Sequence, residues 1–316
     1  MGDVTNEQAQ KDRVGKGAFT MDNEHVIITD VTPRDGLQDA TGFVPLDEKA
    51  ALVEGIVSAG LRHVEVTSFV HPKWIPMLAD GEELLKALPT NLRERFVALA
   101  PNVKGVERAA AAGIRSVMLV ASASESHNRS NLNRSREETI EILKVAASTA
   151  KQRGIAVHGA ISVAFDCPFE GRVPLKNVVD MAEAYGEMGV EQLNLADTIG
   201  TATPRLVKER IRAIQEAIGK DIPLALHLHD RFGWGLANVA MAFDVGVRRF
   251  ESALGGLGGC PYAPDAPGNM DTERLVEFFE AEGINTGINR ERLGEVRQRI
   301  LSVVAQGLKP PERIAG

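Results

Sequence analysis

Short apolar runs and longer amphipathic stretches alternate regularly along residues 25–254. The apolar runs predict eight buried strands, at 25–32, 62–69, 95–101, 114–122, 155–165, 190–197, 223–230 and 248–254. The stretches between them repeat apolar residues at helical spacing and predict helices at 46–60, 81–88, 103–112, 136–153, 175–188, 204–218 and 235–245. The chain is therefore predicted to repeat a unit of one strand and one helix, roughly 30 residues long.

Five of these predicted helices end on a glycine that comes just before the next strand. The five are Gly60, Gly113, Gly154, Gly189 and Gly246. Glycine at a helix end adopts the left-handed conformation that terminates the helix, because it has no Cβ to clash. Strands that alternate with helices in this way predict a parallel sheet.

The number of units favours a closed barrel over an open sheet. Eight strand–helix units match the α/β class and the (β/α)₈ TIM barrel, and a doubly wound open sheet is the alternative. Residues 293–308 predict one more amphipathic helix, outside the eight units. We expect residues 23–316 to form a single domain with this C-terminal helical extension, and residues 1–22, which are polar, to be a disordered tail.

Composition narrows the class of protein. The chain has 316 residues, a formal net charge of −7 and no strongly basic run, so we expect no nucleic-acid partner. It has no apolar run of about 18 residues, so we expect no membrane span, and residues 1–22 lack the apolar core of a signal peptide. Two cysteines, Cys167 and Cys260, do not make a disulfide framework, and a cytoplasmic location is expected.

Polar residues gather where the predicted strands end, which is where TIM barrels carry their chemistry. Arg34 and Asp35 follow the first strand in the segment TPRDGLQ. His227 and His229, in HLHD, point to the same side of the seventh strand, because side chains alternate along a strand. Two such imidazoles are either half of a metal site or buried core histidines. With the Asp35 carboxylate they form a mixed nitrogen and oxygen set, which suits Mg²⁺ or Mn²⁺ better than structural zinc.

Three further features stand near these strand ends. Glu65 lies within the second strand, where an acid needs a partner, and Arg34 on the neighbouring strand is a candidate for a structural pair or for a pair that holds Arg34 in a catalytic pose. Asp197 ends the sixth strand. Cys260 lies in GGLGGCPYAPDAPGN, whose glycines predict a hinge that lets the loop close over a substrate. Buried apolar packing is the alternative for this thiol.

Seven segments together resemble the 3-hydroxy-3-methylglutaryl-CoA lyases, which are metal-dependent Claisen-type enzymes built on TIM barrels. The segments are TPRDGLQ, EVTSFVHPKW, SASE, CPFEG, ADTIGTATP, HLHD with GLAN, and GGLGGCPYAPDAPGN. The resemblance covers residues 25–300. The run GLGGCPYA separates the lyases from related synthases and aldolases, whereas the RDG and HxH elements are shared by the whole superfamily.

The resemblance implies a role for each matching residue. Mg²⁺ or Mn²⁺ would be bound by Asp35, His227, His229 and Asn269. Catalytic roles would fall to Arg34, Asp35, Glu65, His227 and Cys260. Substrate would be bound by Arg34, Gln38, Ser68, Asn131 and Asp197. Arg34 would face the thioester carbonyl, and Cys260 would be the catalytic thiol. His227 and Asp35 both stay open as the base.

The implied reaction is the cleavage of 3-hydroxy-3-methylglutaryl-CoA, an acyl-CoA substrate, to acetyl-CoA and acetoacetate. That activity would place the protein in leucine degradation and ketone-body formation. We also expect a homo-oligomer, a dimer or larger.

Two departures from the family pattern leave the acyl group open. The family has Asn-Glu where this chain has Asp39-Ala40, and Thr-Tyr-Gly-Gln-Ala where it has residues 231–235, RFGWG. Citramalyl-CoA or a longer-branched glutaryl-CoA is therefore an alternative substrate. A condensing synthase or an aldolase acting on a 2-oxo acid, which would not need Cys260, is a second alternative. A non-catalytic barrel that binds CoA or metal is a third.

Overall fold

Eight parallel strands close into a barrel in the computed structural model, which describes residues 25–258 and 268–310. Around the ring the strands follow the order β1-β10-β9-β8-β5-β4-β3-β2. Their bounds are β1 Ile27–Asp30, β2 His63–Ser68, β3 Phe96–Leu99, β4 Ser116–Ser122, β5 Ala156–Ser162, β8 Gln192–Asp197, β9 Leu224–Leu228 and β10 Arg249–Ser252. The predicted TIM barrel is confirmed and the open sheet is wrong. The predicted tail, residues 1–22, lies outside the described residues.

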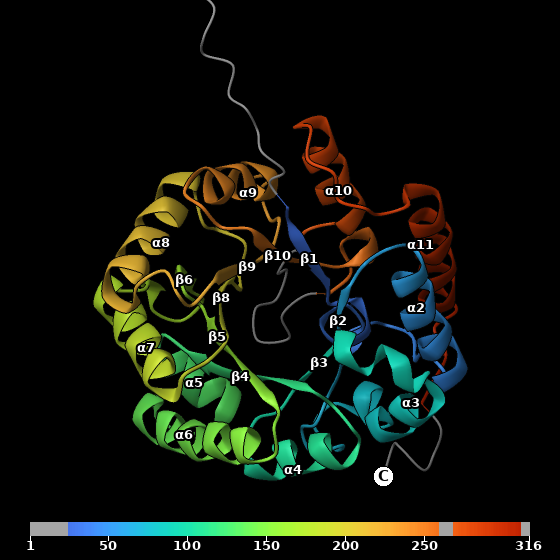
Figure 1. The fold of residues 1–316 in the computed structure, drawn as a ribbon, viewed down its shortest axis with the longest axis horizontal. Helices are drawn as coiled ribbons and strands as arrows, with labels where there is room; N and C mark the ends of the chain where they lie inside the picture. The colour runs from blue at the N-terminus through green and yellow to red at the C-terminus, as the bar shows by residue number, and fades with distance from the viewer. Residues whose placement is uncertain (1–24, 259–267, 311–316) are drawn as a thin grey trace, which may run out of the picture.

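A ring of helices surrounds the barrel (Figure 1). Eight of them follow the eight strands in turn: α2 Leu46–Ser58, α3 Gly81–Ala87, α4 Val103–Ala111, α6 Arg136–Gln152, α7 Leu175–Met188, α8 Pro204–Ile218, α9 Gly235–Asp244 and α10 Thr272–Ala281. The predicted C-terminal helix is α11 Arg290–Ala305, which packs on the outside of the ring against α2. A small hairpin, β6 Asp166–Cys167 and β7 Gly171–Arg172, follows β5.

Two helices were not predicted from the apolar pattern. Helix α5, Glu125–Leu132, occupies the segment after β4, which is polar enough to read as a loop. It is stabilised instead by its ends, because the Ser124 hydroxyl accepts from the His127 amide and Asn133 closes the helix with a φ of 54°. Helix α10 begins after Asp271, whose side chain accepts from the Arg274 amide. It is the helix of the eighth unit.

The five glycines predicted to end helices all have positive φ, from 62° at Gly189 to 107° at Gly60. A residue with a Cβ is strained in that region, so the prediction of left-handed helix ends is confirmed. Only one or two residues separate each of these glycines from the next strand, which keeps each strand–helix unit short.

The barrel is apolar outside and polar inside. On β8, Leu193 and Leu195 belong to the apolar core that lies between sheet and helices, whereas Asn194 between them points to the barrel interior. The same alternation on β10 places Phe250 in the apolar core and Glu251 inside. Apolar packing therefore holds the helices on the sheet, and the interior is left for polar chemistry.

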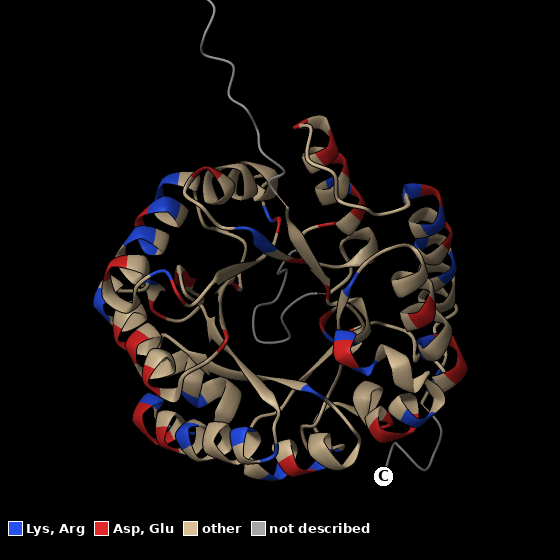
Figure 2. Ribbon diagram, viewed as in Figure 1, with Lys and Arg blue, Asp and Glu red and all other residues tan. Residues whose placement is uncertain are grey.

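Charged residues lie mainly on the helix ring, with both signs interspersed (Figure 2). Among the described helices, none combines the length and the apolar character needed to cross a lipid bilayer.

Replacing Tyr185 by Phe tests how α7 is joined to the barrel. The Tyr185 side chain is fully buried, and its hydroxyl lies 3.0 Å from the carbonyl oxygens of both Leu119 and Ala160. Removing the hydroxyl takes away the buried donor, so we expect Tyr185→Phe to lower the free energy of unfolding by about 1 to 3 kcal/mol. Urea denaturation measures this change. Val145→Ala, at an exposed position on α6, is the control, and an equal effect of both variants would contradict the prediction.

Candidate functional site

A cavity of about 1520 Å³ opens at the carboxyl ends of the strands. Seven of the residues singled out in the sequence line it: Arg34, Asp35, Gln38, Ser68, Asn131, His227 and His229. They come from β1, β2, β9 and α5 or from the segments that directly follow these strands, and they are brought together only when the barrel closes.

Arg34 and Asp35 lie in a π-helical turn, η1, which spans Thr32–Gly36 and begins two residues after β1. The amides of Arg34 and Asp35 both donate to the Val31 carbonyl, at 3.1 and 2.8 Å, so the chain turns sharply at the barrel rim. The Thr32 hydroxyl accepts from the Leu254 amide at 2.8 Å, which ties this turn to the segment after β10. Backbone hydrogen bonds thus hold both side chains over the barrel mouth.

Asp35, His227 and His229 converge on one point. Each is buried, and their candidate ligand atoms all lie within 4.8 Å of one another. His227 Nε2 is 3.8 Å from Asp35 Oδ2 and 3.1 Å from His229 Nε2. This is the arrangement predicted from the HLHD pattern and TPRDGLQ, and its nitrogen and oxygen donors suit a metal ion.

Asn269 lies beside this triad. Residues His229 and Asn269 form an antiparallel bridge, and the Asn269 amide nitrogen donates to Asp35 Oδ2 and to the Leu257 carbonyl, both at 2.8 Å. Gly258 makes room for it, because a Cβ at that position would clash with Asn269 Nδ2. Asn269 is therefore held against a candidate ligand, and metal binding by its amide oxygen stays a prediction.

Arg34 is joined to two acids. Its Nε and Nη2 lie 2.7 and 2.5 Å from Glu65 Oε2, and its Nη1 donates to Asp35 Oδ1. Burial lowers the pKa of Arg34, but the Glu65 and Asp35 carboxylates outweigh this and raise it, so the guanidinium stays charged. The predicted pairing of Arg34 with Glu65 is confirmed, and it holds the guanidinium in one orientation.

The buried charges at the site do not balance. Asp35, Glu65 and Glu251 are three buried carboxyl groups around the Arg34 guanidinium, and burial raises the pKa of the one on Glu65. Buried charge is costly unless it is compensated. A divalent cation would compensate the remaining negative charge, so the residues present fit such an ion.

The environment separates the proton affinities of the two candidate bases. Burial raises the pKa of Asp35, but Arg34, His227 and His229 outweigh it and lower the pKa to about 2. Burial lowers the pKa of His227, but the hydrogen bond to Glu251 and the Asp35 charge reverse this, so its pKa lies above the ordinary value. His227 is therefore the stronger proton acceptor of the two.

Glu251 is the functional residue that the sequence reasoning missed. It is buried on β10, it lines the cavity, and its Oε2 lies 2.9 Å from His227 Nδ1. The signal was available, because Glu251 is an acid within a predicted strand, RRFESAL, as Glu65 is in HVEVTSF. The argument that an acid in a strand needs a partner applies to both.

The remaining candidates take different places. Ser68 lines the cavity and its hydroxyl accepts from the Val70 amide at 3.3 Å, while Asn131 lies exposed on α5. Both oxygens of Asp197 accept backbone amides, from Thr201 and Ala202, so this buried carboxylate shapes the loop after β8. Substrate binding by Gln38, Ser68, Asn131 and Asp197 stays a prediction. Cys260 lies outside the described residues.

The two departures from the family pattern are not equivalent in space. Asp39 lines the cavity next to Gln38, where burial raises the pKa of its carboxyl group. Phe232 and Trp234 are 54% and 42% exposed, pack on each other with ring centroids 4.9 Å apart, and are not among the residues that line the cavity. Asp39 is therefore the departure that lines the cavity.

Comparison with known proteins identifies the family of this chain. A family model described as HMGL-like matches residues 25–300. The chain is 39% identical over 268 residues to the hydroxymethylglutaryl-CoA lyase of Bacillus subtilis, covering 85% of this chain and 89% of that protein. It is 39% identical over 272 residues to the human mitochondrial hydroxymethylglutaryl-CoA lyase, covering 86% and 83%. An HMG-CoA lyase structure from Acinetobacter baumannii, in complex with coenzyme A and 3-methylmalate, matches with a TM-score of 0.85 and 36% identity, over 94% of this chain and 96% of that one.

Metal binding at the triad should weaken in acid. His227 can bind a cation only when Nε2 is unprotonated. Because the pKa of His227 is raised, protons begin to compete with the metal at a pH above the ordinary imidazole pKa. We expect the affinity for Mn²⁺ to fall as pH is lowered from about 8 to about 6. Titration calorimetry at several pH values measures this, with circular dichroism to verify that the fold persists. An affinity that does not change over this range would contradict the prediction.

Proposed function

Because this chain belongs to the HMGL-like family, whose curated relatives are hydroxymethylglutaryl-CoA lyases, we propose that it cleaves 3-hydroxy-3-methylglutaryl-CoA to acetyl-CoA and acetoacetate. The observation that carries the proposal is the convergence of Asp35, His227 and His229 beside the Arg34 guanidinium, in a cavity at the carboxyl ends of the strands. This places a candidate base and a fixed positive charge in one site.

We propose Mg²⁺ or Mn²⁺ as the cofactor. Asp35, His229 and Asn269 would hold it, and His227 would complete the set until it takes up the substrate proton. Oxygen and imidazole donors with an excess of acidic groups support a hard divalent cation. When bound, such an ion lowers the pKa of a coordinated hydroxyl group and polarises a carbonyl.

Bond cleavage begins with removal of the proton from the C3 hydroxyl. His227 accepts this proton, because its pKa is raised whereas that of Asp35 is lowered. The oxygen then forms a carbonyl with C3, and the electrons of the C2–C3 bond pass to the thioester fragment. Acetoacetate and the enolate of acetyl-CoA result. Glu251, which is hydrogen-bonded to His227 Nδ1, stabilises the imidazolium that forms.

Arg34 stabilises the enolate oxygen. Its side chain is only 12% exposed and is held by Glu65 through two nitrogen atoms, so it does not have to reorient as negative charge develops on the thioester oxygen. Preorganised charge in a site shielded from water is usually the largest single contribution to catalysis. Glu65 acts through Arg34 and does not face the substrate itself.

The enolate carbon must finally receive a proton. The family resemblance assigns this step to the Cys260 thiol, which would end as a thiolate and be reprotonated from solvent. An ordinary thiol pKa of about 8.5 is low enough for protonation of an enolate carbon.

An acyl-CoA substrate is supported by the similar lyase structure that contains coenzyme A. The exact acyl group stays open, because the Asp39 carboxylate lines the cavity where the family has Asn. Citramalyl-CoA and a longer-branched glutaryl-CoA are the alternative substrates. The homo-oligomer, the cytoplasmic location and the place in leucine degradation and ketone-body formation stay predictions.

A cleavage assay tests the function. Purified protein with Mg²⁺ should release equal amounts of acetyl-CoA and acetoacetate from 3-hydroxy-3-methylglutaryl-CoA. Chelation should abolish this release, and added Mg²⁺ or Mn²⁺ should restore it, because the ion would lower the pKa of the hydroxyl group that the base must deprotonate. Comparison of kcat/KM with citramalyl-CoA identifies the preferred acyl group. Turnover that persists after complete chelation would refute the metal mechanism.

Cys167 provides a matched control for the role proposed for Cys260. Cys260→Ser should lower kcat by roughly 100-fold to 10,000-fold, since a serine hydroxyl is a far weaker acid. Cys167→Ser should leave kcat unchanged, because Cys167 is buried beside Ser124, with Sγ 3.0 Å from its Oγ, and does not line the cavity. Normal turnover of Cys260→Ser would favour the synthase or aldolase alternative.

A further inference from the structure

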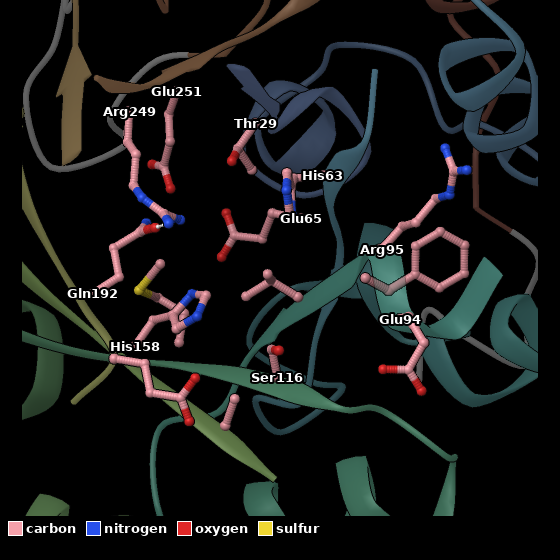
Figure 3. A pocket seen from close by; sticks show the side chains of 15 residues that line it. Thr29, His63, Glu65, Glu94, Arg95, Ser116, His158, Gln192, Arg249 and Glu251 are labelled. Carbon is pink, nitrogen blue, oxygen red and sulfur yellow. Dashed lines mark hydrogen bonds between the residues drawn. The ribbon is translucent and has the colours of Figure 1, made fainter. Parts of the chain in front are cut away.

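A second, smaller cavity of about 120 Å³ lies at the opposite end of the barrel (Figure 3). It is lined by residues that begin strands, among them His63 on β2, Gln192 on β8 and Arg249 on β10. Figure 3 shows Arg249 and Gln192 side by side at this cavity, with Glu251 above them on the same strand as Arg249. Glu251 also lines the large cavity, so it links the two ends of the barrel.

Four hydrogen bonds connect Arg249 to the candidate active site. Arg249 Nη1 donates to Gln192 Oε1 at 2.8 Å, and Gln192 Nε2 donates to Asn194 Oδ1 at 2.7 Å. Asn194 Nδ2 then donates to Glu251 Oε1, and Glu251 Oε2 lies 2.9 Å from His227 Nδ1. Between Gln192 and His227 every member is buried, which limits the access of water to these bonds.

Arg249 sets the direction of this chain of hydrogen bonds. A guanidinium has only donors, so the oxygen of the Gln192 amide must face Arg249 and its nitrogen must face Asn194. The Asn194 amide is oriented by the same reasoning, with its nitrogen toward Glu251. An ionised carboxylate has only acceptors, so His227 must place its proton on Nδ1.

We propose that Gln192, Asn194 and Glu251 are positioning residues, which hold His227 in the tautomer whose unprotonated Nε2 faces the site. This inference rests on the proposed function, in which that nitrogen binds the cation and accepts the substrate proton. Loss of a partner that sets the tautomer of a ligating histidine typically lowers metal affinity by about 10-fold to 100-fold. The chain of hydrogen bonds assigns these residues a role that they perform through His227.

Glu251→Gln tests the chain at the step next to His227. Asn194 Nδ2 still needs an acceptor, so the oxygen of the new amide faces Asn194 and its nitrogen faces His227 Nδ1. The His227 proton is then moved to Nε2, where it blocks the cation. We expect the affinity for Mn²⁺ to fall about 10-fold to 100-fold.

The double variant Asn194→Asp with Glu251→Gln restores the direction of the chain. The carboxylate introduced at position 194 accepts from the amides on both sides, so the oxygen of the amide introduced at position 251 can face His227 Nδ1 again. The double variant also keeps the net charge of the native pair. We expect it to recover most of the Mn²⁺ affinity, which a purely structural role of Glu251 would not produce. Glu191→Gln, at an exposed position next to Gln192, is the control and should bind Mn²⁺ as the native protein does.

Two measurements separate this inference from the proposed function. Electron paramagnetic resonance gives Mn²⁺ affinity, and ¹⁵N spectra of histidine-labelled, metal-free protein show which His227 nitrogen carries the proton. Nδ1 should be protonated in the native protein and in the double variant, and Nε2 in Glu251→Gln. Equal Mn²⁺ affinity of native and Glu251→Gln proteins would overturn the inference, as would failure of the double variant to recover. Native protein that shows the Nδ1 tautomer but binds no Mn²⁺ would support the inference and count against the proposed cofactor.

Discussion

The compensation of buried charge is the constraint on which this site depends. Asp35, Glu65 and Glu251 are withdrawn from water inside the barrel, and an unpaired buried carboxylate costs several kcal/mol. Arg34 compensates two of them directly, and the third, Glu251, forms a hydrogen bond with His227 Nδ1. The remaining negative charge favours a divalent cation at this site. In the proposed metal site, the same carboxylates that are costly to bury would be the source of metal affinity.

The polar interior is possible because the barrel does not need its inside to be apolar. Each strand sends alternate side chains outward, and the outward set, which includes Val64, Leu193 and Phe250, forms the apolar core with the helices. The inward set forms hydrogen bonds from Arg249 at one end to His227 near the other. A buried polar network stabilises a single arrangement when its members are satisfied. Such rigidity would hold the proposed catalytic side chains in place before a substrate binds.

The glycines near the site have a steric role that the hinge hypothesis did not include. Gly256 and Gly258 have φ of 66° and 101°, and the backbone of Gly268 approaches the Gly256 carbonyl so closely that a Cβ at 268 would overlap its oxygen. These contacts let the chain on either side of residues 259–267 pack against Asn269 and Asp35. The glycines in the described residues therefore shape the candidate metal site itself. Closure of the loop over a substrate concerns residues outside the described part of the chain and stays a prediction.

The sequence by itself determined the barrel and most of the candidate ligands. The eight apolar runs and the glycine helix ends are local patterns, and local patterns are enough to predict strands, helices and their parallel order. The alternation along HLHD placed His227 and His229 on one face for the same reason. Helix α5 was missed because its stability comes from its ends and not from an apolar face.

Which residues meet across the barrel was decided only by the tertiary structure. The contacts Glu251–His227, Asn194–Glu251 and Asn269–Asp35 join residues 24, 57 and 234 positions apart, and no local pattern carries information about such pairs. Strand closure brings them within hydrogen-bonding distance, and burial then makes each bond obligatory.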